Sequence, residues 1–192
     1  MQPSLTKIDV ARRQLVTAIR LLFDGEDSVS IFSLAANAWE VIDVLCNKAG
    51  VDSFSNQARE QIQGGKDLKR DFINSPYRNF FKHADQDGEA VLLPLKDSDV
   101  DSLIFLAVED YLRFQKKSPV EFQVFQLWFM CIYTDKVSAE ALSEVLGAKK
   151  SKFPNINSLV RADCLAMGKK VLVDAREDQE LLNDPLTEHI LL

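Results

Sequence analysis

The sequence predicts an all-α protein, an up-and-down bundle of four to five helices followed by additional C-terminal helices. Three observations predict this class. Apolar residues recur at three- and four-residue steps through most of the 192 residues, as they do along one face of a helix. Serine, proline and glycine stand where these periodic runs begin and end. The extended apolar run at residues 91–95 contains Pro94, which cannot donate a hydrogen bond within a sheet, so we expect a connector there and no sheet.

The first two predicted helices are long and follow one another closely. The first covers residues 6–23 and ends before Gly25. The second begins at Ser28, which can cap it, and ends before Gly50. The apolar face of the first helix consists of Ile8, Ala11, Leu15, Ile19 and Leu22. We expect the two helices to pack antiparallel.

The middle of the chain is predicted as two shorter helical pieces and one long helix. Residues 52–75 are more polar and carry a Gly-Gly pair at 64–65, which predicts a short helix, a break and a second piece. Ser75 as N-cap and Pro76 as first helical residue then start a helix that extends through residue 83. After the connector, acidic residues open the clearest helix of the chain. Its core positions are Val100, Leu103, Ile104, Ala107, Val108, Tyr111 and Leu112.

The C-terminal part is predicted as three further helices. The run Ser118-Pro119-Val120-Glu121 has the pattern of a capping box in front of residues 122–133, which are apolar almost all round. Exposing the aromatic rings of that helix would cost several kcal/mol at about 25 cal/mol per Å², so we expect it in the core or against a partner subunit. The next helix covers residues 138–146 and stops at Gly147, and the last covers residues 157–175.

Length and composition indicate a globular protein with a bundle over residues 1–117 and a helical extension, residues 118–192, packed on the same core. The chain has 29 acidic and 23 basic residues, so no overall basic field attracts nucleic acid and any RNA contact must be local. Three cysteines far apart in apolar surroundings predict reduced thiols and a cytoplasmic protein. The N-terminus lacks the layout of a secretory signal, and no uncharged apolar run approaches the roughly 20 residues that span a bilayer, so we expect no membrane partner.

The segment from Arg78 to His83 carries the residues that point to chemistry. An imidazole that titrates near neutral pH and a permanently charged guanidinium are what phosphodiester cleavage without a metal requires. On a helix Asn79 and His83 lie one turn apart and share a face. With the guanidinium on a phosphate, the imidazole can take a proton from the neighbouring 2′-OH of RNA. The sequence has no zinc-binding motif and no glycine-rich phosphate loop, so we expect no metal and no cofactor.

The run Arg78-Asn79-Phe80-Phe81-Lys82-His83 resembles the Arg-x4-6-His motif of the HEPN (higher eukaryotes and prokaryotes nucleotide-binding) superfamily, with Asn79 as the polar residue after the arginine. The resemblance implies a four- to five-helix bundle and a homodimer in which both motifs line one cleft. It also implies a metal-independent endoribonuclease, a toxin or defence protein whose products have cyclic phosphate ends. The resemblance implies that Arg78 contacts the phosphate and the transition state, that His83 is the general acid or base, and that Asn79 is an orienting group. Residues 118–192 have no counterpart in that family.

Several charged residues near the motif are candidates for supporting roles. Glu40 is an acid in an apolar stretch, so it either pairs with Arg78 and positions it or faces solvent on the outer side of its helix. Asn37 is a weaker candidate of the same kind. Lys69, Arg70 and Lys82 belong to a local basic excess that either receives an RNA backbone or forms an ordinary solvated surface.

Two other functions fit the same residues. In the first, Arg78 and His83 are surface residues of a non-catalytic helical module that dimerises and binds nucleotide or a protein. In the second, the protein is the stable partner of a nucleotidyltransferase. An antitoxin is a further candidate partner if the protein is a toxin. His189 lies near the C-terminus without acidic or cysteine neighbours, and we expect it to be a tail residue and not a ligand.

Overall fold

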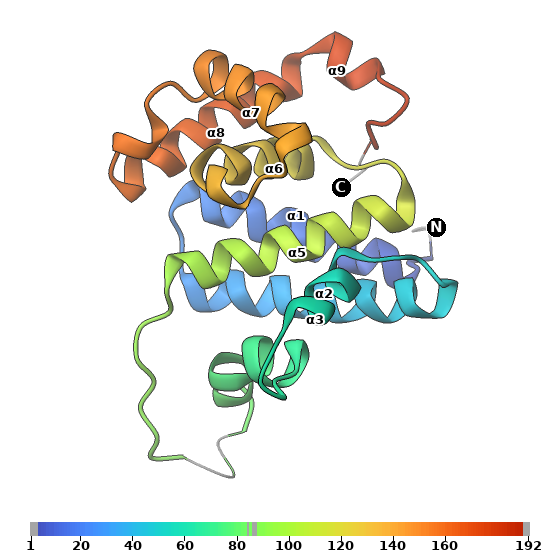
Figure 1. Cartoon of the computed structure of the whole chain (residues 1–192), viewed down its shortest axis with the longest axis vertical. Helices are drawn as coiled ribbons and strands as arrows, with labels where there is room; N and C mark the ends of the chain where they lie inside the picture. The colour runs from blue at the N-terminus through green and yellow to red at the C-terminus, as the bar shows by residue number, and fades with distance from the viewer. Residues whose placement is uncertain (1–3, 84, 86–87, 190–192) are drawn as a thin grey trace. The chain divides into compact units, whose positions relative to one another are not determined.

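A computed structural model describes residues 4–83, 85 and 88–189, and it confirms the predicted all-α class (Figure 1). These residues contain no strand, and an isolated β-bridge joins Ser118 and Thr187. The helical elements are α1 (Lys7–Asp24), α2 (Ser28–Ala49), α3 (Phe54–Gln61), η1 (Leu68–Arg78), α5 (Asp97–Gln115), α6 (Val120–Ile132), η2 (Thr134–Lys136), α7 (Ala139–Lys152), η3 (Ile156–Ser158), α8 (Arg161–Glu177) and α9 (Gln179–Asn183).

The chain forms two compact units. The chain up to Ala18 and the segment Ser28–Phe114 make the first, and Ile19–Asp27 with the chain from Gln115 onward make the second. The sequence-based boundary between residues 117 and 118 lies close to the main division. Periodicity alone did not reveal that α1 contributes residues to both units.

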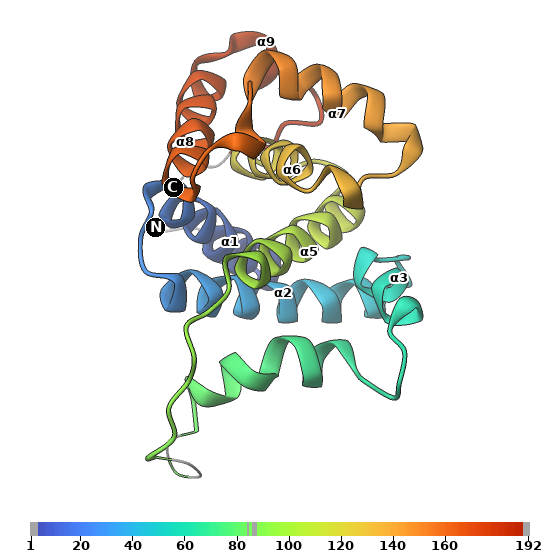
Figure 2. The ribbon, with the colours of Figure 1, turned by 60° about the vertical axis from the view of Figure 1, so that its left-hand side comes forward.

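In the first unit α2 is the central helix. Residues 7–18 of α1 run antiparallel to it, and α5 runs in the same direction as α2 (Figures 1 and 2). The thiol of Cys46 on α2 donates to the backbone oxygen of Asp110 on α5, 3.6 Å away. Gly50 follows α2 with a φ of +65°, a conformation that other residues rarely adopt, which explains why the helix ends at this glycine. The fully buried side chains here include Leu15, Trp39, Ile42, Ile104 and Tyr111.

The composition of α2 suits either a core helix or a membrane span. With 22 residues it is long and apolar enough to cross a bilayer, and half of its most apolar window is buried inside the protein. Core helices of soluble proteins satisfy the same length and composition test, so α2 is weak support for a membrane segment.

A buried polar network joins α3 to α2 and α5. The carboxylate of Asp110 accepts hydrogen bonds from the backbone N–H and the hydroxyl of Ser55, and Ser55 Oγ accepts one from the indole N–H of Trp39 at 2.9 Å. All three residues are fully buried. Burial raises the pKa of Asp110 to about 6, because removing the carboxylate from water outweighs the stabilising hydrogen bonds from Ser55.

The second unit is built around α6, which packs against α7 and α8 (Figure 2). The prediction that this apolar helix lies in a core is confirmed, because Phe122, Phe125 and Trp128 are fully buried. Trp128 also donates its indole N–H to the backbone oxygen of Cys164 on α8 at 2.9 Å. The thiols of Cys46, Cys131 and Cys164 are all free and buried, as predicted.

The predicted capping box in front of α6 is wrong. Ser118 is buried and pairs with the C-terminal segment, where its N–H donates to the backbone oxygen of Leu186 at 3.0 Å. Glu121 is also buried, and its Oε1 accepts from Arg20 at 2.6 Å and from Arg176 at 2.8 Å. The backbone of Ser118 and the side chain of Glu121 are therefore used in tertiary contacts, and the start of α6 has no side-chain cap.

The predicted end of α7 at Gly147 is also wrong, because α7 continues to Lys152. Gly147 is solvent-exposed within the helix, and three lysines of the last turn lie near the negative end of the helix dipole, which stabilises them there. The last predicted helix starts later than expected, at Arg161, after the short turn η3. A further short helix that the sequence did not predict, α9, covers Gln179–Asn183.

Candidate functional site

The motif lies at the end of η1, which a kink divides in two. Asp67 caps the start by accepting from the N–H of Arg70 at 2.7 Å. Ser75 has extended backbone angles, so the helix restarts after it as predicted. The restarted helix ends at Phe80, and His83 lies beyond it. The expectation of a continuous helix through residue 83 is therefore wrong, although the N–H of His83 still donates to the Asn79 oxygen at 3.0 Å.

Tyr77 anchors the motif to the rest of the first unit. The ring is buried and packs edge-on against Phe32 of α2, with 5.1 Å between centroids. Its hydroxyl donates to the carboxylate of Asp99 in the first turn of α5 at 2.8 Å. Phe81 also packs edge-on against Phe32, at 6.1 Å. These contacts hold the Arg78 backbone in a fixed place beside α2.

Arg78 reaches across to α2 and forms an ion pair with Glu40, as one of the two sequence interpretations predicted. The guanidinium also donates to the amide oxygens of Asn37 at 3.2 Å and Asn74 at 3.5 Å. Its side chain is 13% exposed. The Nε atom is buried and has no hydrogen-bond partner in the described part of the chain. Arg78 is thus held in one orientation by three side chains.

Glu40 carries a second cation. Its Oε1 accepts from Lys69 Nζ at 2.6 Å while Oε2 faces Arg78. Partial burial alone would raise the pKa of Glu40, but hydrogen bonds from Lys69 and Arg78 outweigh it and lower that pKa. The Glu40 side chain is 32% exposed, so it is both on the outer side of α2 and ion-paired. One carboxylate with two cations leaves this cluster with a net positive charge.

The other polar residues of the motif face solvent. Asn79, Lys82 and His83 are all exposed. The imidazole of His83 makes no hydrogen bond or ion pair with the residues that the structure describes. The structure therefore brings Arg78, Glu40 and Asn37 together and leaves the imidazole accessible.

The predicted RNA-binding cations are mostly paired with acids. Arg70 is exposed and contacts Asp71 at 2.8 Å, and its hydrogen bond is the main cause that lowers the pKa of Asp71 to about 2. Lys69 is bound to Glu40. Lys82 forms no ion pair within the described ranges and is the basic residue most available to a phosphate.

Sequence reasoning missed Asn74, Tyr77 and Asp99 as parts of this site. The spacing of Asn74, four residues before Arg78, is the signal that could have identified it, because helical residues four apart share a face. Nothing in the sequence pattern links Tyr77 to Asp99, which lies 22 positions further on.

Comparison with known proteins places no constraint on this site. No protein-family model, no curated protein and no solved structure matches the chain significantly. Within residues 4–83, 85 and 88–189, no group of three or more His, Cys, Asp or Glu side chains is arranged to hold a metal ion.

Proposed function

We propose that this protein is a HEPN-like, metal-independent endoribonuclease with Arg78, Asn79 and His83 at its active site. The observation that carries the proposal is a guanidinium held in place by side chains of α2, with an accessible imidazole five residues further along the same segment. Arg78 is held by Glu40 and Asn37, and the exposed His83 follows five residues later on the same segment. Acid–base cleavage of a phosphodiester needs a preorganised positive charge and a titratable base, and this segment supplies one of each.

The proposed reaction is an internal transfer at phosphorus. His83 takes the proton of the 2′-OH, the 2′-oxygen bonds to the adjacent phosphorus, and the bond to the 5′-oxygen breaks. The leaving oxygen takes a proton, and the upstream product carries a cyclic phosphate. Arg78 neutralises the charge that develops on the phosphoryl oxygens, for which a planar guanidinium is well suited.

Glu40 is a positioning residue in this proposal. We assign it no contact with the reacting atoms, since one of its carboxylate oxygens binds Lys69 and the other binds Arg78. The carboxylate restricts the guanidinium to one orientation, so the arginine side chain loses less conformational entropy when a substrate phosphate binds. A homodimer with both motifs at one cleft would bring a second imidazole to protonate the leaving oxygen.

A second candidate function is a non-catalytic helical module that binds nucleotide or a protein. One observation favours it: Arg78 already has three bonding partners and little exposed surface, so a phosphate must displace or join them. Arginines in such ion pairs are often architectural. In this case His83 is an ordinary exposed residue.

Expression in cells separates the two candidates. We expect the wild-type protein to arrest growth and degrade cellular RNA, and the Arg78→Ala/His83→Ala double variant to do neither at the same protein level. If both proteins leave RNA intact, the module is favoured. Size-exclusion chromatography with light scattering tests the proposed homodimer in the same preparations.

The cellular location and the partners of the protein are also proposals. We infer a cytoplasmic toxin or defence protein, restrained by an antitoxin or by a nucleotidyltransferase partner. The buried, reduced thiols are consistent with a reducing compartment. Co-purification with the products of neighbouring genes tests the partner.

A further inference from the structure

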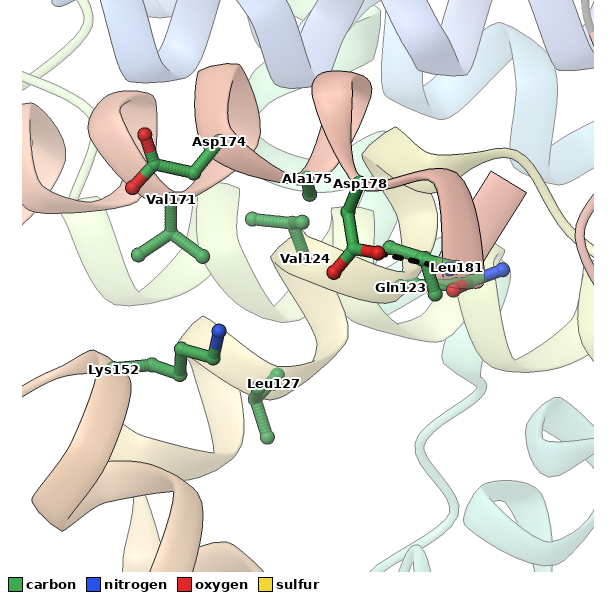
Figure 3. Close-up of a pocket in the computed structure, with 9 residues that line it drawn as sticks. All are labelled: Gln123, Val124, Leu127, Lys152, Val171, Asp174, Ala175, Asp178 and Leu181. Carbon is green, nitrogen blue, oxygen red and sulfur yellow. Dashed lines mark hydrogen bonds between the residues drawn. The ribbon is translucent and has the colours of Figure 1, made fainter. Parts of the chain in front are cut away.

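A pocket of about 300 Å³ lies within the second unit, and none of its lining residues belongs to the proposed active site (Figure 3). Its apolar lining comes from α6, α8 and α9. These residues are Val124, Leu127, Val171, Ala175 and Leu181. This volume is at the lower end of the range for pockets that bind small molecules. An apolar floor with a few polar groups is typical of such pockets.

The charged residues of the pocket are separated by sign. Lys152, the last residue of α7, stands on one side, and Asp174 and Asp178 stand on the α8 side (Figure 3). The Lys152 ammonium points toward the pocket and forms no ion pair or hydrogen bond within the part of the chain that the structure describes. An ammonium beside an apolar surface without a counterion is available to a ligand anion.

The two carboxylates each retain an unused oxygen. Asp178 Oδ1 caps α9 by accepting from the N–H groups of Glu180 and Leu181 at 3.0 and 3.1 Å. Asp174 Oδ2 accepts from Lys170 at 2.8 Å. The second oxygen of each carboxylate has no partner within the described residues. Both residues lie at the C-terminal end of α8, where the helix dipole also favours a cation.

We propose that this pocket binds a free α-amino acid with an aliphatic or aromatic side chain. The ammonium group of the ligand faces Asp174 and Asp178, its carboxylate faces Lys152, and its side chain covers the apolar floor. A ligand with about nine non-hydrogen atoms, such as leucine, binds with a dissociation constant in roughly the micromolar to millimolar range at ordinary ligand efficiency. This proposal is independent of the ribonuclease activity.

Calorimetry on the full chain with defined ligands tests it. We expect L-leucine or L-phenylalanine to bind at a single site. N-acetyl-L-leucine, which lacks the ammonium group, and L-leucinamide, which lacks the carboxylate, should each bind at least about tenfold more weakly. Failure of all apolar amino acids to bind at 10 mM would overturn the proposal, and so would equal binding of leucine and its two analogues.

Charge variants then test which pocket residues bind the ammonium group and which bind the carboxylate group of the ligand. Lys152→Met should weaken leucine at least about tenfold and leave leucinamide unchanged. The double variant Asp174→Asn/Asp178→Asn should also weaken leucine binding at least about tenfold and leave the affinity for N-acetyl-leucine unchanged. Asparagine at position 178 can still cap α9, so we expect the variant to fold. The matched controls Lys150→Met and Asp163→Asn change exposed residues of α7 and α8 outside the pocket and should leave affinity unaltered. Leucine binding that is insensitive to the pocket variants would refute the site.

Discussion

The packing of Gly168 against Phe23 leads to a sharp prediction about the second unit. A Cβ added at Gly168 would lie 2.3 Å from Phe23 Cε1 and 2.6 Å from Cδ1. The ring of Phe23 is 3% exposed and packs edge-on against Trp128, with 5.5 Å between centroids. The ring has little room to move, so Gly168→Ala forces the helix or the core to shift.

The size of the effect follows from two opposing contributions. Overpacking of a well-packed core costs about 1–3 kcal/mol. Alanine in a helix gains up to about 1 kcal/mol over glycine. Because the closest contact is far shorter than a van der Waals contact, we expect Gly168→Ala to lower the free energy of unfolding by about 2 kcal/mol.

Gly147 provides the matched control, because it is also a helical glycine but has no atom within 4 Å of an added Cβ. Gly147→Ala should therefore stabilise the protein by about 0.5–1 kcal/mol. Urea unfolding followed by circular dichroism measures both variants. A Phe23→Leu background, which removes the ring, should reduce the cost of Gly168→Ala. If the two alanine variants show the same stability, the close packing described for α8 is incorrect.

Three further predictions concern buried charge and thiols. Because the folded pKa of Asp110 is raised above its ordinary value, its contribution to stability is complete below pH 3.8 and is lost as pH rises through about 6. Between pH 4 and 7 the free energy of unfolding, measured with urea, should fall by about 2 kcal/mol more for wild type than for Asp110→Asn. Parallel pH profiles of the two proteins would contradict this. Glu121→Gln should lower the unfolding free energy by about 1–2 kcal/mol, because the buried carboxylate binds two partly exposed arginines, and an unchanged urea midpoint would count against that triad. Burial raises the pKa of Cys46 to about 12 and of Cys131 to about 11, so a thiol reagent should modify them only on unfolding, and fast labelling of the native protein would disprove their burial.

Local signals predicted most of the helices. The spacing of apolar residues located α1, α2, α5 and α6 because each has a face or a whole surface in a core. Gly25 and Gly50 follow their helices with positive φ, a conformation that glycine adopts readily and other residues rarely do, so the residue type itself indicates the helix end.

The errors had two causes: a glycine that a helix tolerates, and tertiary contacts that override local preference. Gly147 stays helical since its neighbours favour a helix, and Ser118 forms a β-bridge instead of a cap. Glu121 is bound by arginines from α1 and α8, which are distant in sequence. No window of local sequence contains that information.

The candidate site was predicted in part. The pairing of Glu40 with Arg78 was one of two alternatives that the sequence left open, based on the cost of burying an unpaired acid, and the structure shows the ion pair with the Glu40 side chain still 32% exposed. The end of the helix before His83 was not predicted, because the sequence around Phe80 and Phe81 has no strong stop signal. Asn74 and the contact between Tyr77 and Asp99 depend on the fold of the whole first unit.

Cleavage of RNA by purified protein tests the central proposal most directly. The assay compares wild type, His83→Ala and His189→Ala, which alters the other histidine of the chain, on a labelled RNA in the presence of a chelator. We expect wild type and His189→Ala to cleave at equal rates and leave cyclic phosphate ends, while His83→Ala loses at least about a hundredfold in rate, as expected for removal of a general acid or base. Equal cleavage by His83→Ala and wild type would contradict the proposed active site.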